Sequence, residues 1–125
     1  MTTLLALYRR PDGGPEAQAV FEGRYAAEHL PLVAATPGLR ETRVTRVAEA
    51  LGAETDLILV TWMRFDDRAA LDAGLRSDAM RAAGRNLRDI GPGLATLLVV
   101  EDAPELLAAA SQAVDTVGSA VEDRP

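Results

Sequence analysis

The chain has 125 residues and a formal net charge of −6 at pH 7, so we expect no binding to the phosphate backbone of a nucleic acid. It contains no cysteine, no lysine and a single histidine, which excludes disulfides, thiolate or multi-histidine metal sites and lysine Schiff bases. With 48% hydrophobic and 26% charged residues the composition is globular, and the chemistry that remains is acid–base catalysis or binding.

The sequence predicts neither a membrane span nor a secretory signal. No apolar run approaches the ~20 residues that a transmembrane helix needs. Near the N-terminus, Arg9 and Arg10 follow the short apolar stretch, whereas a secretory signal has its charges first. We therefore expect a cytoplasmic protein without a membrane partner.

The first elements are a strand and a helix. A short apolar run predicts a strand over 3–8, closed by the turn-forming residues 11–15. Pro15 suits the first turn of a helix, which we expect to end near His29 because Pro31 disfavours helical backbone at the residue before it. Its inward face is predicted from the helical spacing of Ala17, Val20 or Phe21, and Tyr25.

The second half of the pattern begins with a strand over 39–47 and, after a loop, an antiparallel strand over 56–65. The latter is apolar on both faces, which indicates a central strand covered on both sides. Two helical stretches follow, the first capped by Asp66 or Asp67 and ending at Leu75, the second running from Ser77 to Gly91. The last strand is expected over 94–101.

This β-α-β-β-α-β order predicts an α+β, ferredoxin-like domain with a four-stranded antiparallel sheet over residues 1–103. Two helices would cover one sheet face, and burial of the second apolar face predicts a C2 homodimer. Residues 104–125 form a helical extension with a frayed end over 122–125. That helix would pack over the dimer or build a higher oligomer.

His29 is the strongest candidate for chemistry because it is the one side chain that titrates near neutral pH without perturbation. Tyr25 lies four residues earlier, so a helix would place both rings on one face. Two interpretations stay open at this point. His29 could transfer protons, or its charge could cap the carbonyl end of the helix.

Two segments of the chain resemble the EthD family of dimeric α+β barrel proteins. The first is Leu7-Tyr8-x2-Pro11-x-Gly13. The second is Phe21-x3-Tyr25-x3-His29-x-Pro31-Leu32-Val33, followed by Pro37-Gly38-Leu39. The resemblance covers about residues 3–101. It implies a homodimer whose two sheets form one barrel, with a pocket in each subunit between sheet and helices.

The resemblance also bears on activity. Related barrels include methylmuconolactone isomerases, polyketide cyclases, small cofactor-free monooxygenases and haem enzymes. The lactone isomerases carry a comparable histidine for proton transfer, but their companion cysteine has no counterpart here. EthD members often have an acidic residue late in the second helix, where this chain has Asn86, with Asp89 three positions further on.

Our first hypothesis is a cofactor-independent isomerase, cyclase or dehydratase that acts on a small carbonyl or lactone-like metabolite. His29 would move a proton α to the carbonyl while Tyr25 stabilises the enolate oxygen. No metal and no cofactor are expected, and the remaining candidates for the substrate pocket are Tyr8, Trp62, Asn86 and Asp89. Each of these four also has a structural interpretation, in the core, in the dimer interface or on a polar helix face.

Two alternatives remain. The protein could bind a small apolar ligand, or assist a partner enzyme of a catabolic or biosynthetic pathway, without performing chemistry itself. It could also bind haem with His29 as the axial ligand, as some members of the wider barrel group do.

Overall fold

The structure, a computed structural model, describes the backbone of residues 1–122 and the side chains of residues 1–113. Its sheet has the strand order β2-β3-β1-β4, and all neighbouring strands are antiparallel. The strands are β1 (Thr2–Arg9), β2 (Glu41–Arg46), β3 (Leu57–Phe65) and β4 (Ala95–Glu101). The predicted ferredoxin-like α+β architecture is thus confirmed.

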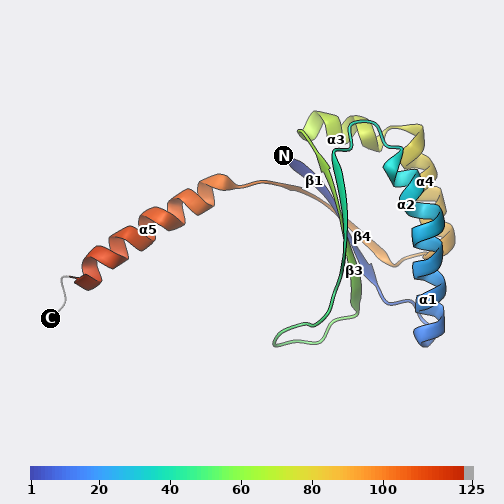
Figure 1. The fold of residues 1–125 in the computed structure, drawn as a ribbon, viewed down its shortest axis with the longest axis horizontal. Helices are drawn as coiled ribbons and strands as arrows, with labels where there is room; N and C mark the ends of the chain where they lie inside the picture. The colour runs from blue at the N-terminus through green and yellow to red at the C-terminus, as the bar shows by residue number, and fades with distance from the viewer. Residues whose placement is uncertain (123–125) are drawn as a thin grey trace.

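The helices lie on one face of this sheet, except for the last (Figure 1). They are α1 (Gly14–Arg24), η1 (Tyr25–His29), α2 (Leu30–Ala34), α3 (Arg68–Leu75), α4 (Asp78–Ile90) and α5 (Pro104–Glu122). Helices α1, α2 and α4 cover the sheet, whereas α5 extends away from it on the opposite side (Figure 1). Of the predicted frayed end, Glu122 is still helical, and 123–125 lie outside the described residues.

The ends of α3 and α4 follow the capping chemistry of the sequence. The side chain of Asp67 accepts a hydrogen bond from the Ala70 amide at 2.8 Å, and that of Ser77 accepts from the Met80 amide at 3.2 Å. Both side chains satisfy amide groups that have no partner within the helix. The two predicted helix starts are confirmed, and Asp67 is the cap of the first.

The prediction that the first helix ends near His29 is wrong. A single π-helical turn, η1, joins α1 to α2, with the Leu30 amide donating to the Tyr25 carbonyl, and the helix continues to Ala34. Pro31 lies in the first turn of α2, next to this widened turn. Proline is tolerated there because the amide that it lacks would have no regular α-helical partner at such a junction.

The core lies between the helices and the sheet. Its sheet side consists of alternate residues of β1 and β3, all buried: Leu4, Ala6, Tyr8, Leu59, Thr61, Met63 and Phe65. From α1 it receives Phe21, which is buried, whereas Val20 is 63% exposed. Of the two inward positions considered for this turn, Phe21 is the correct one.

The other sheet face is apolar and open. Trp62 and Leu98 both lie opposite Leu5 on this face, and they are 39% and 42% exposed. The indole Nε1 of Trp62 donates to Thr45 Oγ1 at 3.2 Å, which holds the ring along β2. Figure 1 shows α5 extending on this same side. Among the described residues, no helix has the length and apolarity to cross a membrane.

Candidate functional site

An apolar cavity of about 100 Å³ lies between α4, the η1–α2 segment and the sheet. Only His29 and Tyr8 bring polar side chains to its wall. The other lining residues are apolar or glycine: Leu4, Val33, Met63, Leu75, Met80, Ala83, Gly84, Leu87 and Leu97. Leu75 and Leu97 are themselves exposed, so the cavity reaches the surface beside α3 and the edge strand β4.

His29 is buried at the end of η1, and its ring is stacked on that of Tyr25, with 5.1 Å between centroids and 23° between planes. The predicted common face of these two residues is confirmed. Burial lowers the pKa of His29 below its ordinary value, although hydrogen bonds to the Asn86 side chain and the Ala83 backbone oppose the decrease. The imidazole is therefore neutral at neutral pH.

The interpretation of His29 as a C-terminal helix cap does not fit the structure. The helical segment continues through α2 to Ala34, five residues beyond His29. The ring is also uncharged at neutral pH, and a neutral ring has no favourable interaction with the negative end of a helix dipole.

A chain of three buried hydroxyl groups lies beside His29. The Tyr25 hydroxyl donates to the Tyr8 hydroxyl at 3.1 Å and is 2.6 Å from Thr61 Oγ1. Burial raises the pKa of both tyrosines, so each phenol keeps its proton. Tyr8 belongs to the cavity wall, whereas Tyr25 lies behind it.

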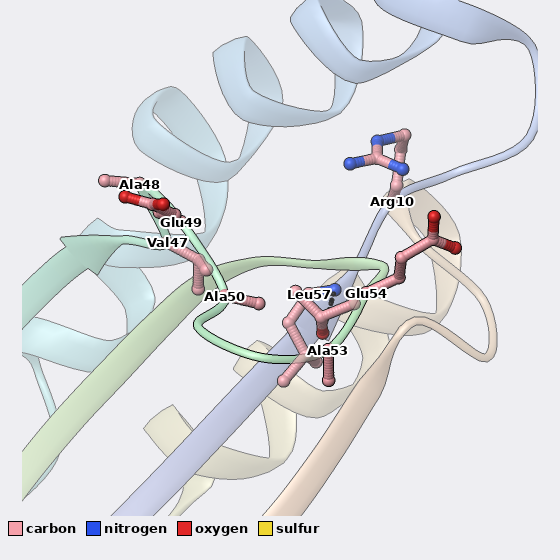
Figure 2. Close-up of a pocket in the computed structure, with 9 residues that line it drawn as sticks. Arg10, Val47, Ala48, Glu49, Ala50, Ala53, Glu54 and Leu57 are labelled. Atoms are coloured by element: carbon pink, nitrogen blue, oxygen red, sulfur yellow. Dashed lines mark hydrogen bonds between the residues drawn. The ribbon is translucent and has the colours of Figure 1, made fainter.

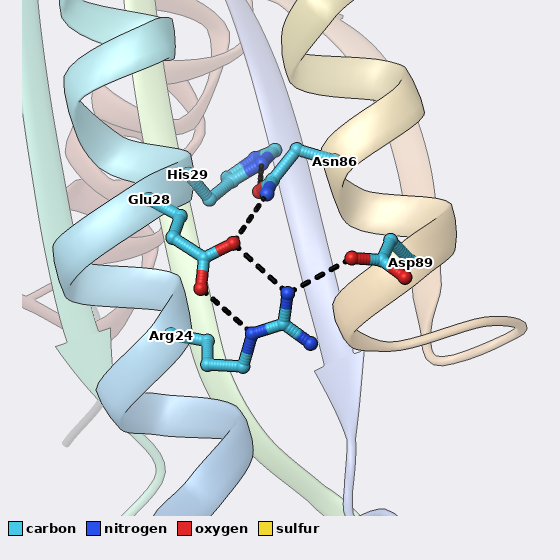
Figure 3. A network of polar contacts seen from close by, with 5 residues as sticks. All are labelled: Arg24, Glu28, His29, Asn86 and Asp89. Atoms are coloured by element: carbon cyan, nitrogen blue, oxygen red, sulfur yellow. Dashed lines mark hydrogen bonds and ion pairs between the residues drawn. The ribbon is translucent and has the colours of Figure 1, made fainter.

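A polar network joins η1 to α4 at the rim of the site (Figure 3). Asn86 Nδ2 donates to Glu28 Oε1 at 3.1 Å, and Asn86 Oδ1 is 3.2 Å from His29 Nδ1. Arg24 donates to Glu28 at 2.7 and 3.0 Å and to Asp89 Oδ2 at 2.8 Å. Hydrogen bonding to Arg24 lowers the pKa of Glu28, which keeps that carboxylate ionised.

The structure separates the predicted site residues into three groups. His29 and Tyr8 share the cavity, with Tyr25 and Asn86 as their hydrogen-bonding neighbours. Asp89 contacts Arg24 rather than His29. Trp62 lies on the opposite face of the sheet and does not line this cavity, because alternate residues of a strand point to opposite faces.

Sequence reasoning missed Thr61 and Glu28. Thr61 is a polar residue on the otherwise apolar inward face of β3, and a buried hydroxyl requires a hydrogen-bond partner. Glu28 stands four residues after Arg24, a spacing that favours an ion pair along a helix. Both signals were present in the sequence. They do not show, however, that the Thr61 hydroxyl contacts Tyr25 or that Glu28 also accepts a hydrogen bond from Asn86.

A larger hollow of about 390 Å³ lies elsewhere, in the β2–β3 connection (Figure 2). Arg10 and residues from the segment 47–57 line it, and none of the predicted site residues belongs to it. Its acidic groups, Glu49 and Glu54, stand on an exposed loop. Within the described part of the chain, no three His, Cys, Asp or Glu side chains gather as a potential metal site.

A second groove, mainly apolar but also lined by Arg88, adjoins the cavity. It has a volume of about 230 Å³, runs between α4 and β4, and shares Gly84, Leu87 and Leu97 with the cavity wall. Its far end is formed by the turn between these two elements, at Gly91 and Gly93.

Several solved structures have the same fold. A dimeric protein with a ferredoxin-like fold from Bacteroides fragilis is 18% identical, with a TM-score of 0.59 over 81% of this chain and 95% of that one. A DABB family protein from Mesorhizobium loti is 13% identical, with a TM-score of 0.64 over 82% and 97% of the two chains. At these identities the likeness establishes the fold alone.

One solved structure is also similar in sequence. No protein-family model matches the chain, and no curated protein matches it. An EthD family protein from Bacillus halodurans, however, is 31% identical, with a TM-score of 0.74 over 82% of this chain and 99% of its own. The likeness extends over nearly the whole of that relative, and the chain therefore belongs to the EthD family.

Proposed function

We propose that the cavity between sheet and helices binds a small, mainly apolar molecule with a carbonyl group, and that His29 transfers a proton within it. One observation carries this proposal: a neutral, buried imidazole and the side chain of Tyr8 line an otherwise apolar cavity. A general base must be unprotonated at the working pH and lie within hydrogen-bond reach of its proton.

The step that this pair can perform is enolisation. His29 takes a proton from the carbon next to the carbonyl, the electron pair of that C–H bond forms a C=C bond, and the π pair of the C=O bond moves to the oxygen. A hydrogen bond from a phenol stabilises the resulting enolate. Return of the proton to another position completes an isomerisation, which needs no further reactant.

Tyr8, rather than Tyr25 as first expected, is the better donor to the ligand. Each hydroxyl has one proton to donate, and Tyr25 donates its proton to the hydroxyl of Tyr8. The hydroxyl of Thr61 must then donate to that of Tyr25. No other partner of the Thr61 hydroxyl is present among the described residues. The Tyr8 proton has no acceptor in that part of the chain either, and its ring lines the cavity.

The volume limits the size of the ligand. About 100 Å³ is small against the several hundred Å³ of ordinary ligand pockets. The groove between α4 and β4 shares Gly84, Leu87 and Leu97 with the cavity, so a longer molecule can extend into it. The ligand class is thus a compact apolar carbonyl compound with its polar end beside His29 and Tyr8.

We further propose that the protein is a homodimer in which the open sheet face is buried. The exposed apolar side chains of this face, among them Trp62 and Leu98, form a surface of the kind that monomers rarely expose. The Bacteroides fragilis protein with the same fold is described as dimeric. A C2 pairing of this face with itself would bury it in both copies.

Helix α5 is expected to pack on such a partner. It begins with exposed apolar residues, Leu106 and Leu107, and Figure 1 shows it extending away from its own domain on the side of the open face. Packing on the second copy, or on a neighbouring dimer as a route to a higher oligomer, would bury these side chains.

The experiment for the catalytic proposal is exchange of carbon-bound hydrogen in D2O. A panel of small ketones, lactones and enones is incubated with the protein, and loss of the α-proton signal is followed by NMR. The wild type should accelerate exchange of at least one compound, His29→Gln should abolish the acceleration, and Glu54→Gln, in the loop hollow, should retain it. Acceleration that survives His29→Gln would refute the assignment.

A second candidate function is binding without chemistry. It is favoured by the wall of the cavity, where His29 and Tyr8 are the only polar side chains and no carboxylate is present. Compounds that raise the melting temperature without any exchange of α-protons would support this candidate against the first.

A further inference from the structure

The contacts of Asn86 determine which nitrogen of His29 carries the proton. Asn86 lies between two groups, the carboxylate of Glu28 and the imidazole of His29 (Figure 3). An amide side chain has a donating end and an accepting end, and either could face each neighbour. The surroundings of Asn86 allow only one of these two orientations.

Glu28 settles the orientation of the amide. Its two oxygens are held by the Nε and Nη2 atoms of Arg24, and an ionised carboxylate can only accept hydrogen bonds. The NH2 group of Asn86 must therefore face Glu28, at 3.1 Å, since the reverse orientation would place two oxygens in contact. Asn86 Oδ1 is then directed to His29 Nδ1 at 3.2 Å.

The position of this oxygen determines which nitrogen of the imidazole carries the proton. A hydrogen bond to Asn86 Oδ1 requires a proton on His29 Nδ1, and a neutral imidazole has only one N–H proton. The second nitrogen, Nε2, then holds the lone pair, and the Nδ1 proton must also serve the hydrogen bond of the ring to the Ala83 backbone. The opposite tautomer would bring the lone pair of Nδ1 against the amide oxygen.

We propose that Asn86, oriented by Glu28, is a positioning residue that fixes neutral His29 as the Nδ1–H tautomer and leaves Nε2 as the basic atom. Exchange of a proton between Nε2 and a cavity ligand rests on the proposed function, but the tautomer itself does not. The contribution of Asn86 is geometric, since it lines neither the cavity nor the groove beside it.

The test uses the single histidine of the chain, whose two ring nitrogens can be observed by 15N NMR without assignment. Measured well above the titration midpoint of His29, the wild type should be mainly Nδ1–H. A free histidine side chain favours Nε2–H in water, so this result would be distinctive. Glu28→Gln and Asn86→Leu should each change the tautomer ratio toward Nε2–H by about fivefold, the effect of one ordinary hydrogen bond.

Asp89→Asn is the matched control, because it removes the charge of a partner of Arg24 that has no contact with Asn86 or His29. It should leave the tautomer ratio unchanged. A wild type that is mainly Nε2–H, or a ratio that stays constant in both Glu28→Gln and Asn86→Leu, would overturn the inference. Because no ligand is present in this experiment, its outcome is separate from that of the exchange assay.

Discussion

The hydroxyl of Tyr25 donates to the hydroxyl of Tyr8 at 3.1 Å and lies 2.6 Å from that of Thr61, so one phenol joins an inner strand to the cavity wall. All three residues are buried. A hydrogen-bonded chain of this kind orients its last member, and here that member is the phenol of Tyr8 in the cavity wall.

The first prediction concerns the stability of this chain. Tyr25→Phe removes the donor to Tyr8 and the only partner of the Thr61 hydroxyl in the described part of the protein. Leaving a buried hydroxyl without a partner costs about 1–3 kcal/mol. Urea unfolding should therefore show a loss of this size.

Thr61→Val supplies the matched control, because it removes the hydroxyl that Tyr25→Phe leaves unpaired. The double variant Tyr25→Phe/Thr61→Val should lose clearly less stability than the two single variants added together. Strict additivity would show that the two hydroxyls are not hydrogen-bonded.

The second prediction concerns pH. Burial lowers the pKa of His29 in the folded protein below the 6.5 of the unfolded chain. The unfolded state therefore binds the proton more readily, and stability is full above about pH 6.5 and declines as the pH falls toward the folded pKa. One proton gives a slope of at most about 1.4 kcal/mol per pH unit.

Denaturant unfolding between pH 7 and 5 measures this slope, and His29→Phe, which cannot titrate, should flatten it. The carboxyl groups of Glu28 and Asp66 have pKa values below their ordinary ones, so their protonation changes the stability only at a lower pH than this range. An equal slope in wild type and His29→Phe would mean that the imidazole is not buried in the neutral form.

The third prediction uses Gly84, which lines both the cavity and the adjoining groove. A Cβ atom at this helical position would meet only the end of Arg88, at 3.7 Å. Gly84→Ala should thus stabilise the protein by about 0.5–1 kcal/mol through helix propensity. Gly84→Leu should fold as well but fill the groove.

Thermal shifts with the carbonyl panel distinguish the two variants. Compounds that stabilise the wild type should still stabilise Gly84→Ala and should lose their effect on Gly84→Leu. A compound that stabilises Gly84→Leu as strongly as the wild type must bind elsewhere.

The fourth prediction concerns assembly. Leu98→Glu places a charge on the open sheet face next to Leu5 and should convert a dimer to a monomer in sedimentation. The fluorescence emission of Trp62, the single tryptophan, should move to longer wavelength in the same variant because the ring becomes more exposed to water. Val20→Glu, on the exposed side of α1, is the control and should remain dimeric. A wild type that sediments as a monomer at micromolar concentration would refute the assembly.

The fold could be predicted from the sequence because the local signals agreed with one another. The alternation of β3, the caps Asp67 and Ser77, and the glycine-rich turn after Ile90 each marked an element that the structure contains. The error at Pro31 came from a local rule that a π-helical turn overrides. Such a turn depends on packing of Tyr25 and His29 against the sheet and α4, which the spacing of residues does not reveal.

The candidate site was accessible only in part. The common face of Tyr25 and His29 follows from helical spacing, but the position of Tyr8 in the cavity wall depends on the register of β1 with β3. The place of Trp62 on the far face, by contrast, follows from the alternation of side chains along β3 and can be read from the sequence. Contacts across elements, such as that of Asn86 with Glu28, join residues 58 positions apart and have no signature in the local sequence.

The most direct test of the account is to observe the single imidazole of the chain while a ligand binds. Carbonyl compounds that raise the melting temperature should shift the NMR signals of the His29 ring in the wild type, and the same compounds should leave the ring of Gly84→Leu unchanged. Stabilising compounds that leave the wild-type ring unshifted, and instead shift the amide signals of residues 47–57 around the loop hollow, would contradict the proposed site.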